Sequence, residues 1–458
     1  MAPVAAQVGV QALQDGGNAY DAVVAAALAE IVLQPPKCGL AGDLVAICHN
    51  SGSGMQTLVS IGGAAAALAD AVRRDGQLPP TGALSAGVPG APAGYAALAQ
   101  RGRLGLSRLA APARDLALRG FVWTRVVDVL TRESQELLRR ENPDGCVYLP
   151  DDAPPAEGSV LRLPGLARLL EHFAETGASL FTGEPGRVLR EEVSRRGGVL
   201  TEADLATSRA EWCDPVQADI DGVRLYATPP PTHGPSLCDV VQRAEKGGSA
   251  AALWQVVRSA TQTRRATLGD VRGDGGTSVV GAADADGNTV VVVHSNSFPR
   301  YGSGIVLRDY DLVVSNRAGR GFSAVEGHPN FPAPGKRPAT TLHAWGLDRG
   351  DGAPILGATH GGENQMPWNA QLLMHILGGA APAEAMLAPL WQVDPDDAAL
   401  TVERDLRDEE KRALTAAGAR LTEADSLSLR SGFQLVTVSP TGPMAMSDLR
   451  TIGAAAAW

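Results

Sequence analysis

The pattern of apolar and polar positions in the first half of the chain predicts helices interrupted by β-hairpins. An alanine-rich apolar run over residues 19–33 predicts a helix, since it follows Asn18, a typical N-cap residue, and stops before Pro35. Apolar runs at residues 44–49 and 55–60 flank a polar stretch and predict a hairpin. Further helices are expected at 93–101, 108–119 and within 161–198, and a second hairpin at 216–220 with 223–227.

The second half of the chain changes character. Residues 238–274 begin with a helical pattern and then become polar around Arg264, Arg265 and Arg272, which predicts a loop or linker with little to bury. Strands are expected at 277–282, 289–295, 305–307, 312–315, 341–347 and 355–359, followed by helices at 368–377 and 381–388. This mixture predicts an α+β fold in which two stacked antiparallel sheets are flanked by helices, an αββα sandwich.

Charge and composition indicate which kinds of molecule the protein can bind. The chain has 458 residues, a formal net charge of −10 and a pI near 5.4, which argues against binding along nucleic acid and favours a small-molecule partner. The N-terminus lacks the pattern of a secretory signal, and the longest apolar stretch, residues 22–33, contains Glu30 and is too short to cross a membrane. We therefore expect a soluble, cytoplasmic protein without a membrane partner.

The cysteines show no pattern that predicts a metal site or a disulfide framework. They are odd in number and scattered, without CxxC or Cys/His spacing, at Cys38, Cys48, Cys146, Cys213 and Cys238. Such cysteines are typical of small buried apolar residues. We expect no metal, no cofactor and no disulfide.

Thr277 is the strongest candidate for chemistry. It follows the polar, flexible sequence Gly273-Asp274-Gly275-Gly276 and opens the apolar run Thr277-Ser278-Val279-Val280. A threonine that becomes a new N-terminus can use its hydroxyl as nucleophile and its freed α-amine as general base. The pattern is therefore typical of a self-cleaving enzyme, although an isolated threonine after two glycines is more often the first residue of an ordinary strand.

Short blocks in one order along the chain together resemble the γ-glutamyltranspeptidase family of N-terminal-nucleophile (Ntn) hydrolases. They lie at residues 15–22, 87–90, 198–205, 229–231, 277 with 284–288, 301–304, 336–338 and 360–362. The resemblance covers nearly the whole chain, except for a helical region before the nucleophile that is shorter here. It implies an Ntn-hydrolase sandwich and a cut between Gly276 and Thr277. The resulting large segment, 1–276, and small segment, 277–458, would form one domain, and a homo-oligomer of this pair stays open.

The resemblance also implies roles for individual residues. Thr277 would be the nucleophile, and the backbone N–H groups of Gly361 and Gly362 would face the developing oxyanion, where a side chain would block close approach. Ser295 falls where the family places a hydroxyl that orients the nucleophile's amine and assists self-cleavage. Thr340 and Thr341 replace two family serines that hydrogen-bond the substrate.

The chain departs from the family where γ-glutamyl substrates are recognised. The stretch at residues 61–66 lacks the family's arginine for the α-carboxylate, and Gly321 stands before Phe322 in place of the family's acidic residue for the α-amine. Because both groups fix a charged partner geometrically, γ-glutamyl transfer from glutathione is not expected.

Other charged and polar residues lie near these positions and are candidates for substrate binding. Arg317 and Arg320 could hold a carboxylate, and His294 or His360 could hydrogen-bond a keto or enol oxygen, whereas surface arginines and structural histidines are the ordinary alternatives. His343 belongs to the same set. Glu363 and Asn364, just past the glycine pair, are candidates for lining the pocket, with helix capping as the ordinary alternative.

The absent export signal, the lost γ-glutamyl clamp and the retained nucleophile resemble a family branch from antibiotic pathways that build 4-alkylproline units. That resemblance implies hydrolysis of a carbon–carbon bond in a small biosynthetic intermediate through a threonine acyl-enzyme. Amide hydrolysis by an acylase, or γ-glutamyl hydrolysis or transfer, would use the same nucleophile and remains an alternative. A further alternative is a non-catalytic paralogue that folds and binds a ligand.

Overall fold

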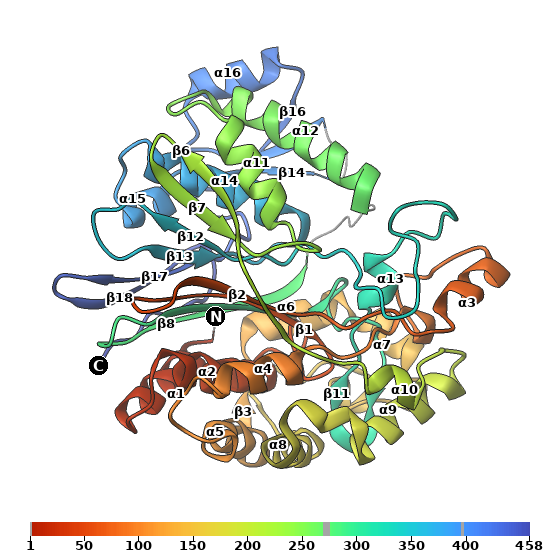
Figure 1. Cartoon of the computed structure of the whole chain (residues 1–458). Coiled ribbons are helices and arrows are strands. Elements are labelled where there is room, and N and C mark those ends of the chain that lie inside the picture. The colour runs from red at the N-terminus through yellow and green to blue at the C-terminus, as the bar shows by residue number, and fades with distance from the viewer. Residues whose placement is uncertain (1, 269–274, 395–397) are drawn as a thin grey trace.

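Two antiparallel sheets lie face to face at the centre of the computed structural model, which describes residues 2–268, 275–394 and 398–458 (Figure 1). The first sheet has the order β5-β2-β1-β9-β8: Glu211–Cys213, Gly54–Ser60, Asp43–Asn50, Thr289–Ser297 and Gly276–Ala283. The second has the order β18-β17-β13-β12-β7-β6: Gly442–Ser447, Gln434–Ser439, Ile355–Ala358, Trp345–Asp348, Val223–Ala227 and Val216–Ile220. The predicted sandwich of stacked sheets is confirmed.

Helices cover the outer face of each sheet (Figure 1). Below the first sheet lie α1 (Pro3–Gln14), α2 (Ala19–Leu33), α4 (Ala91–Ala99), α5 (Leu106–Arg119) and α8 (Pro164–Thr176). Above the second lie α11 (Gly234–Arg243), α12 (Ala250–Leu268), α14 (Gln365–Leu377) and α16 (Asp408–Ala416).

The shorter elements complete these layers. The remaining helices are α3 (Leu68–Asp75), α6 (Arg125–Glu133), α7 (Gln135–Glu141), α9 (Glu184–Arg195), α10 (Glu202–Leu205), α13 (Arg317–Gly321) and α15 (Pro382–Leu387). Two-stranded ladders pair β3 (Phe121–Val122) with β4 (Val160–Leu161) and β10 (Val306–Leu307) with β11 (Leu312–Val313). Among the described residues, no helix is both long and apolar enough to cross a membrane.

The period of two along each strand divides the side chains between two cores. Val279 and Val293 face the second sheet and join Leu356 and Val436 in the core between the sheets. Val280, Val290 and Val292 face the helices and belong to the larger core with α2. The 15 residues of α2 are all buried, and small alanine side chains allow the helix to lie within that core. Asn18 caps it as predicted, accepting hydrogen bonds from the N–H groups of Tyr20 and Asp21.

Two predictions about local structure were wrong. Residues 250–268 form helix α12 rather than a polar linker, and Arg264 on this helix is only 5% exposed. The expected strand at 341–347 begins only at Trp345, because the preceding residues hydrogen-bond to side chains and loops. Helices do lie within 161–198 as predicted, with a 3₁₀ segment, Gly177–Thr182, between α8 and α9.

A third sheet forms from β14 (Trp391–Val393), β15 (Ala399–Glu403) and β16 (Arg420–Ala424) and is joined to the chain's end by a buried ion pair. The guanidinium of Arg450 donates from Nε and Nη2 to the two carboxylate oxygens of Glu403, both at 2.7 Å. The two side chains are at most 1% exposed. The geometry is bidentate, so each charge compensates the other away from water.

Removal of the Glu403 carboxylate should destabilise the fold, because Arg450 would stay buried without this partner. We expect Glu403→Ala to lower the free energy of unfolding by about 3–5 kcal/mol, measured by denaturant titration. Asp425→Asn is the matched control, since Asp425 pairs with Arg404 on the surface, and it should cost less than about 1 kcal/mol. Equal stability of the two variants would contradict the importance of the buried pair.

Candidate active site

Thr277 lies opposite Ser295 in the ladder between β8 and β9, beside a bulge between Gly276 and Thr277. Both side chains are 2% exposed, and the hydroxyl of Thr277 donates to Ser295 Oγ at 3.2 Å. Ser295 Oγ donates to the carbonyl oxygen of Gly276 and accepts from the N–H of Ser297 at 2.8 Å. The serine hydroxyl thus connects the threonine side chain with the carbonyl group that precedes it.

The backbone of Gly362 and the hydroxyl of Thr277 both lie close to Gly275. A Cβ atom placed on Gly275 would lie 3.0 Å from the backbone nitrogen of Gly362 and 3.4 Å from Thr277 Oγ1. Gly361 has a φ of +126°, and a Cβ there would lie 2.2 Å from the indole ring of Trp368. Glycine is therefore required at Gly361 both for its backbone conformation and for space.

Thr340 and Thr341 are buried and connect to the glycine pair through the first residue of α14. The hydroxyl of Thr341 accepts from Nε2 of Gln365 at 3.3 Å, and Gln365 follows the short 3₁₀ segment that begins at Gly362. Thr340 Oγ1 accepts from the N–H of Leu342 at 3.1 Å. The structure thus links the two threonines to the Gly362 segment.

Arg317 is buried and paired rather than solvated. Its Nε donates to Asp43 Oδ2 at 2.6 Å, and the other carboxylate oxygen accepts from the N–H of Gly62 at 3.1 Å. Burial raises the pKa of Asp43, and the charge of Arg317 opposes this rise. Asp43 also lies opposite Ser295 in the ladder between β1 and β9. Arg317 therefore compensates a buried carboxylate next to β9 and beside the segment at residues 61–66.

Arg320 occupies a different environment. Its guanidinium lies over the ring of Phe298, with 5.1 Å between the guanidinium carbon and the ring centroid. The side chain is half-buried on α13, which also carries Arg317. This stacked position is compatible with a cation at the rim of a site.

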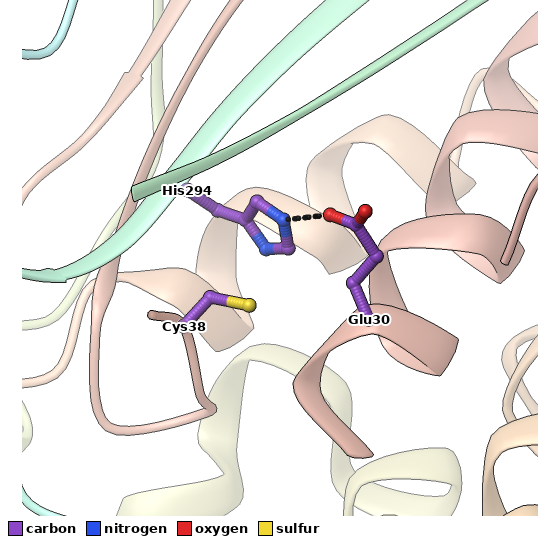
Figure 2. A group of neighbouring side chains, drawn as sticks. All are labelled: Glu30, Cys38 and His294. Atoms are coloured by element: carbon purple, nitrogen blue, oxygen red, sulfur yellow. Dashed lines mark hydrogen bonds and ion pairs between the residues drawn. The ribbon is translucent and has the colours of Figure 1, made fainter. Parts of the chain in front are cut away.

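His294 points away from Thr277. Neighbouring residues of a strand face opposite sides, so His294 lies among the helices while Ser295 faces the second sheet. Figure 2 shows its imidazole bonded to Glu30, with the thiol of Cys38 beside them. Nε2 is 3.0 Å from Glu30 Oε2 and Nδ1 is 2.6 Å from the hydroxyl of Tyr95. His294 is therefore not placed to contact a substrate at Thr277.

The same three residues have the chemistry of metal ligands. Atoms of Glu30, Cys38 and His294 that could bind a metal ion all lie within 4.8 Å of one another. Glu30 and His294 already use these atoms for each other, and burial raises the pKa of the Cys38 thiol well above its ordinary value. The group is a hydrogen-bond network on the helix side of β9, and we assign no metal to it.

Two other histidines are buried and neutral. Burial lowers the pKa of His343 to about 4; its Nδ1 donates to the carbonyl oxygen of Thr341 at 3.0 Å, and Nε2 accepts from Asn369 at 2.8 Å. Burial, assisted by the charge of Lys37, lowers the pKa of His360 well below its ordinary value. His360 directly precedes Gly361, and its Nδ1 has no hydrogen-bond partner within the described residues. A neutral imidazole with an unpartnered nitrogen is suited to bind a polar group of a ligand.

The sequence patterns did not predict that Lys37 and Asp43 would be buried near this ladder. Lys37 is 5% exposed, its carbonyl oxygen accepts from the N–H of Asn296 at 2.8 Å, and its Cα lies 3.5 Å from the position of a Cβ on Gly276. Nothing in the proline-rich turn that precedes it signals this position. Of the sequence before Thr277, Gly273 and Asp274 lie outside the described residues.

Comparisons with known proteins identify a matching family and similar folds. The family model described as gamma-glutamyltranspeptidase matches residues 5–272 and 242–458. The glutathione hydrolase proenzyme of Escherichia coli (strain K12) is 25% identical over 524 residues, covering 98% of this chain and 89% of its own. The solved structure of a cephalosporin acylase from Bacillus halodurans has a TM-score of 0.87 and 28% identity, covering 100% of this chain and 94% of its own. An LmbA structure, at 24% identity and a TM-score of 0.84, covers 98% and 95% and shows the same fold.

The network behind β9 should make stability depend on pH. Burial alone raises the pKa of Glu30, but the positive charge of the N-terminal amine and hydrogen bonds, one of them with His294, hold the pKa below its ordinary value of 4.5. The ionised carboxylate therefore stabilises the fold above about pH 4.5, and this contribution is lost as the pH falls through the lowered pKa. We expect Glu30→Gln to lose about 1.5–3 kcal/mol at pH 7, measured by denaturant titration.

The difference from the parent protein should shrink as the pH falls from about 4.5 toward 3, because Glu30 of the unfolded parent then takes up a proton while the folded carboxylate stays ionised. A difference that stays constant from pH 7 to pH 3 would show that the ionised carboxylate does not stabilise the fold.

Proposed function

The chain belongs to the γ-glutamyltranspeptidase family, and we propose that it is a self-processing Ntn hydrolase whose nucleophile is Thr277. The observation that supports this most directly is the contact of Thr277 Oγ1 with Ser295 Oγ at 3.2 Å, since the serine also bonds the carbonyl oxygen of Gly276. Nucleophile and target carbonyl are thus held together before any cut.

In the maturation step, the hydroxyl of Thr277 attacks the carbonyl carbon of Gly276. The C–N bond of the peptide breaks, the nitrogen takes a proton, and water hydrolyses the resulting ester to leave a free carboxylate at Gly276 and a free amine at Thr277. Ser295 assists by donating to the carbonyl oxygen as negative charge develops there.

The two fragments should stay together because both sheets contain strands from each side of the cut. In the first sheet, β9 of the small fragment pairs with β1 of the large one. In the second, β12 pairs with β7 in the same way. We therefore propose large and small subunits of residues 1–276 and 277–458 that share one domain. The proenzyme name of the Escherichia coli relative supports a processed product.

In turnover, the new amine acts as general base for the hydroxyl of Thr277, which attacks a substrate carbonyl. The N–H groups of Gly361 and Gly362 stabilise the oxyanion, and Thr340 and Thr341 line the substrate's path. The amine then returns its proton to the leaving group, and water hydrolyses the acyl-enzyme. His360 and Arg320 are further candidates for substrate contact.

The finer proposal is hydrolysis of a carbon–carbon bond in a small biosynthetic intermediate, of the kind used in antibiotic pathways of the 4-alkylproline type. In that reaction, the tetrahedral intermediate collapses with release of an enolate-like carbon that takes the proton from the amine. A leaving group that departs as an anion is favoured by nearby cations. Arg264 bonds the carbonyl oxygen of Thr340, and the charge of Lys37 acts on His360 next to Gly361. Residues 61–66 and Gly321 offer neither charge of a γ-glutamyl clamp.

Amide hydrolysis is the second candidate. The similarity to a cephalosporin acylase over the whole chain supports it, and the same threonine, amine and glycine pair would serve. The leaving group would then be an amine rather than a carbon acid.

The mass of the purified chains tests the nucleophile. We expect two fragments that meet between Gly276 and Thr277, and a single uncut chain of 47.4 kDa for Thr277→Ala. Thr277→Ser should still cut because it keeps the hydroxyl, and Ser295→Ala should slow cutting by about tenfold or more. An uncut parent protein would favour a binding protein without catalysis.

A matched pair of substrates separates the two chemistries. We expect faster hydrolysis of 2,4-dioxopentanoate, which has a methylene carbon between its two ketone groups, than of N-acetyloxamate. In N-acetyloxamate, an N–H group replaces that methylene carbon. NMR in D₂O follows both reactions and detects deuterium on the released carbon. Turnover of N-acetyloxamate alone would instead assign amide hydrolysis. Thr277→Ala is the blank for each reaction.

A further inference from the structure

Arg264 is a buried cation without a carboxylate partner in the described part of the chain. It lies one turn before the end of α12 and is 5% exposed. One guanidinium nitrogen, Nη2, donates to the carbonyl oxygen of Thr340 at 2.7 Å, while Nε has no hydrogen-bond partner among the described residues. A buried charge held by one neutral acceptor is costly, so its presence calls for a further partner.

The neighbouring charges compensate it only in part. The carboxylate of Glu363 opposes the effect of burial on Arg264, but it accepts its hydrogen bond from Arg265, at 2.5 Å, and the charge of Arg265 acts in the opposite direction. Burial lowers the pKa of Arg264 to about 10, which leaves the side chain charged at neutral pH. His233, whose Nδ1 also lacks a described partner, contributes no negative charge. Arg317, by contrast, has a carboxylate partner, because it pairs with Asp43.

The position of Arg264 connects this unpaired charge with the proposed active site. Its hydrogen bond ends on Thr340, and the hydroxyl of the next residue, Thr341, accepts from Gln365 near the glycine pair. The adjacent Arg265 bonds Glu363, which directly follows Gly362. The end of α12 thus contacts both segments that are expected to hold the substrate and its oxyanion.

We propose that Arg264 anchors an anion subsite and that the substrate carries a carboxylate that pairs with it. A guanidinium presents parallel N–H donors that match the two oxygens of a carboxylate, and burial strengthens the pair by excluding water. This inference rests on the proposed function, because it takes the site around Thr277 to be the substrate site. It assigns recognition to a residue far in sequence from the family's missing arginine.

NMR titration of the purified, processed protein with glutarate and its neutral counterpart glutaramide tests the subsite. We expect glutarate to bind at least about tenfold more tightly, and Arg264→Gln to remove this preference while leaving glutaramide binding unchanged. Arg264→Lys should retain part of the preference, since it keeps the charge without the fork. Arg258→Gln on the same helix is the matched control and should behave as the parent, because Arg258 stacks on Trp254.

The mass of each variant and its thermal melting show whether it is cut and folded before titration. Equal affinity of the parent for both probes, or unchanged glutarate affinity in Arg264→Gln, would overturn the subsite. A structure of the processed protein in which Arg264 pairs with the new carboxylate of Gly276 would overturn it as well. Carboxylate binding by an uncut protein would instead support the subsite and remove the proposed nucleophile, so the two failures are distinguishable.

Discussion

The register of β8 against β9 is the constraint on which the site depends. It places Thr277 opposite Ser295 on the face toward the second sheet, and it places His294 among the helices on the other face. Because side chains alternate along a strand, a slip of one residue would exchange these faces. The four consecutive valines of β9, residues 290–293, suit either core, so the polar positions that follow distinguish the registers. A slip would separate His294 from Glu30 and turn Ser295 away from Thr277. The polar end of the ladder thus determines which side chain faces Thr277.

Buried charges form a second level of organisation around this ladder. Asp43 with Arg317, and Glu30 with His294, place paired groups against opposite faces of β1 and β9. These pairs fix neighbouring segments to β1 and β9, because each buried group has a partner within hydrogen-bond distance. Arg264 differs in that its described protein partner is only a carbonyl oxygen. The distinction between structural and functional charges therefore comes from their partners rather than from their burial.

Much of this organisation could be predicted from the sequence, and the exceptions have physical causes. The hairpins, α2 and the strand beginning near Thr277 follow from local apolar patterns, and the order of the motifs predicted the sandwich. The sequence also placed Thr277, Ser295 and the glycine pair in one site, although their catalytic roles remain predictions. It could not assign Arg264 to a buried helix, because an arginine-rich pattern is locally the same for a solvated loop. It could not separate His294 from Ser295 by role either, since that requires knowledge of which face of β9 meets the helices.

Each sheet combines strands from both sides of the proposed cut, so refolding differs before and after cleavage. Before the cut, β9 finds β1 within a single chain, and loop closure limits the entropy that this pairing costs. After the cut, the same strands belong to separate molecules whenever the fold is lost, and their reunion depends on concentration. Maturation would therefore convert a reversible folding problem into an assembly problem, so the lifetime of the active protein would depend on its rate of unfolding.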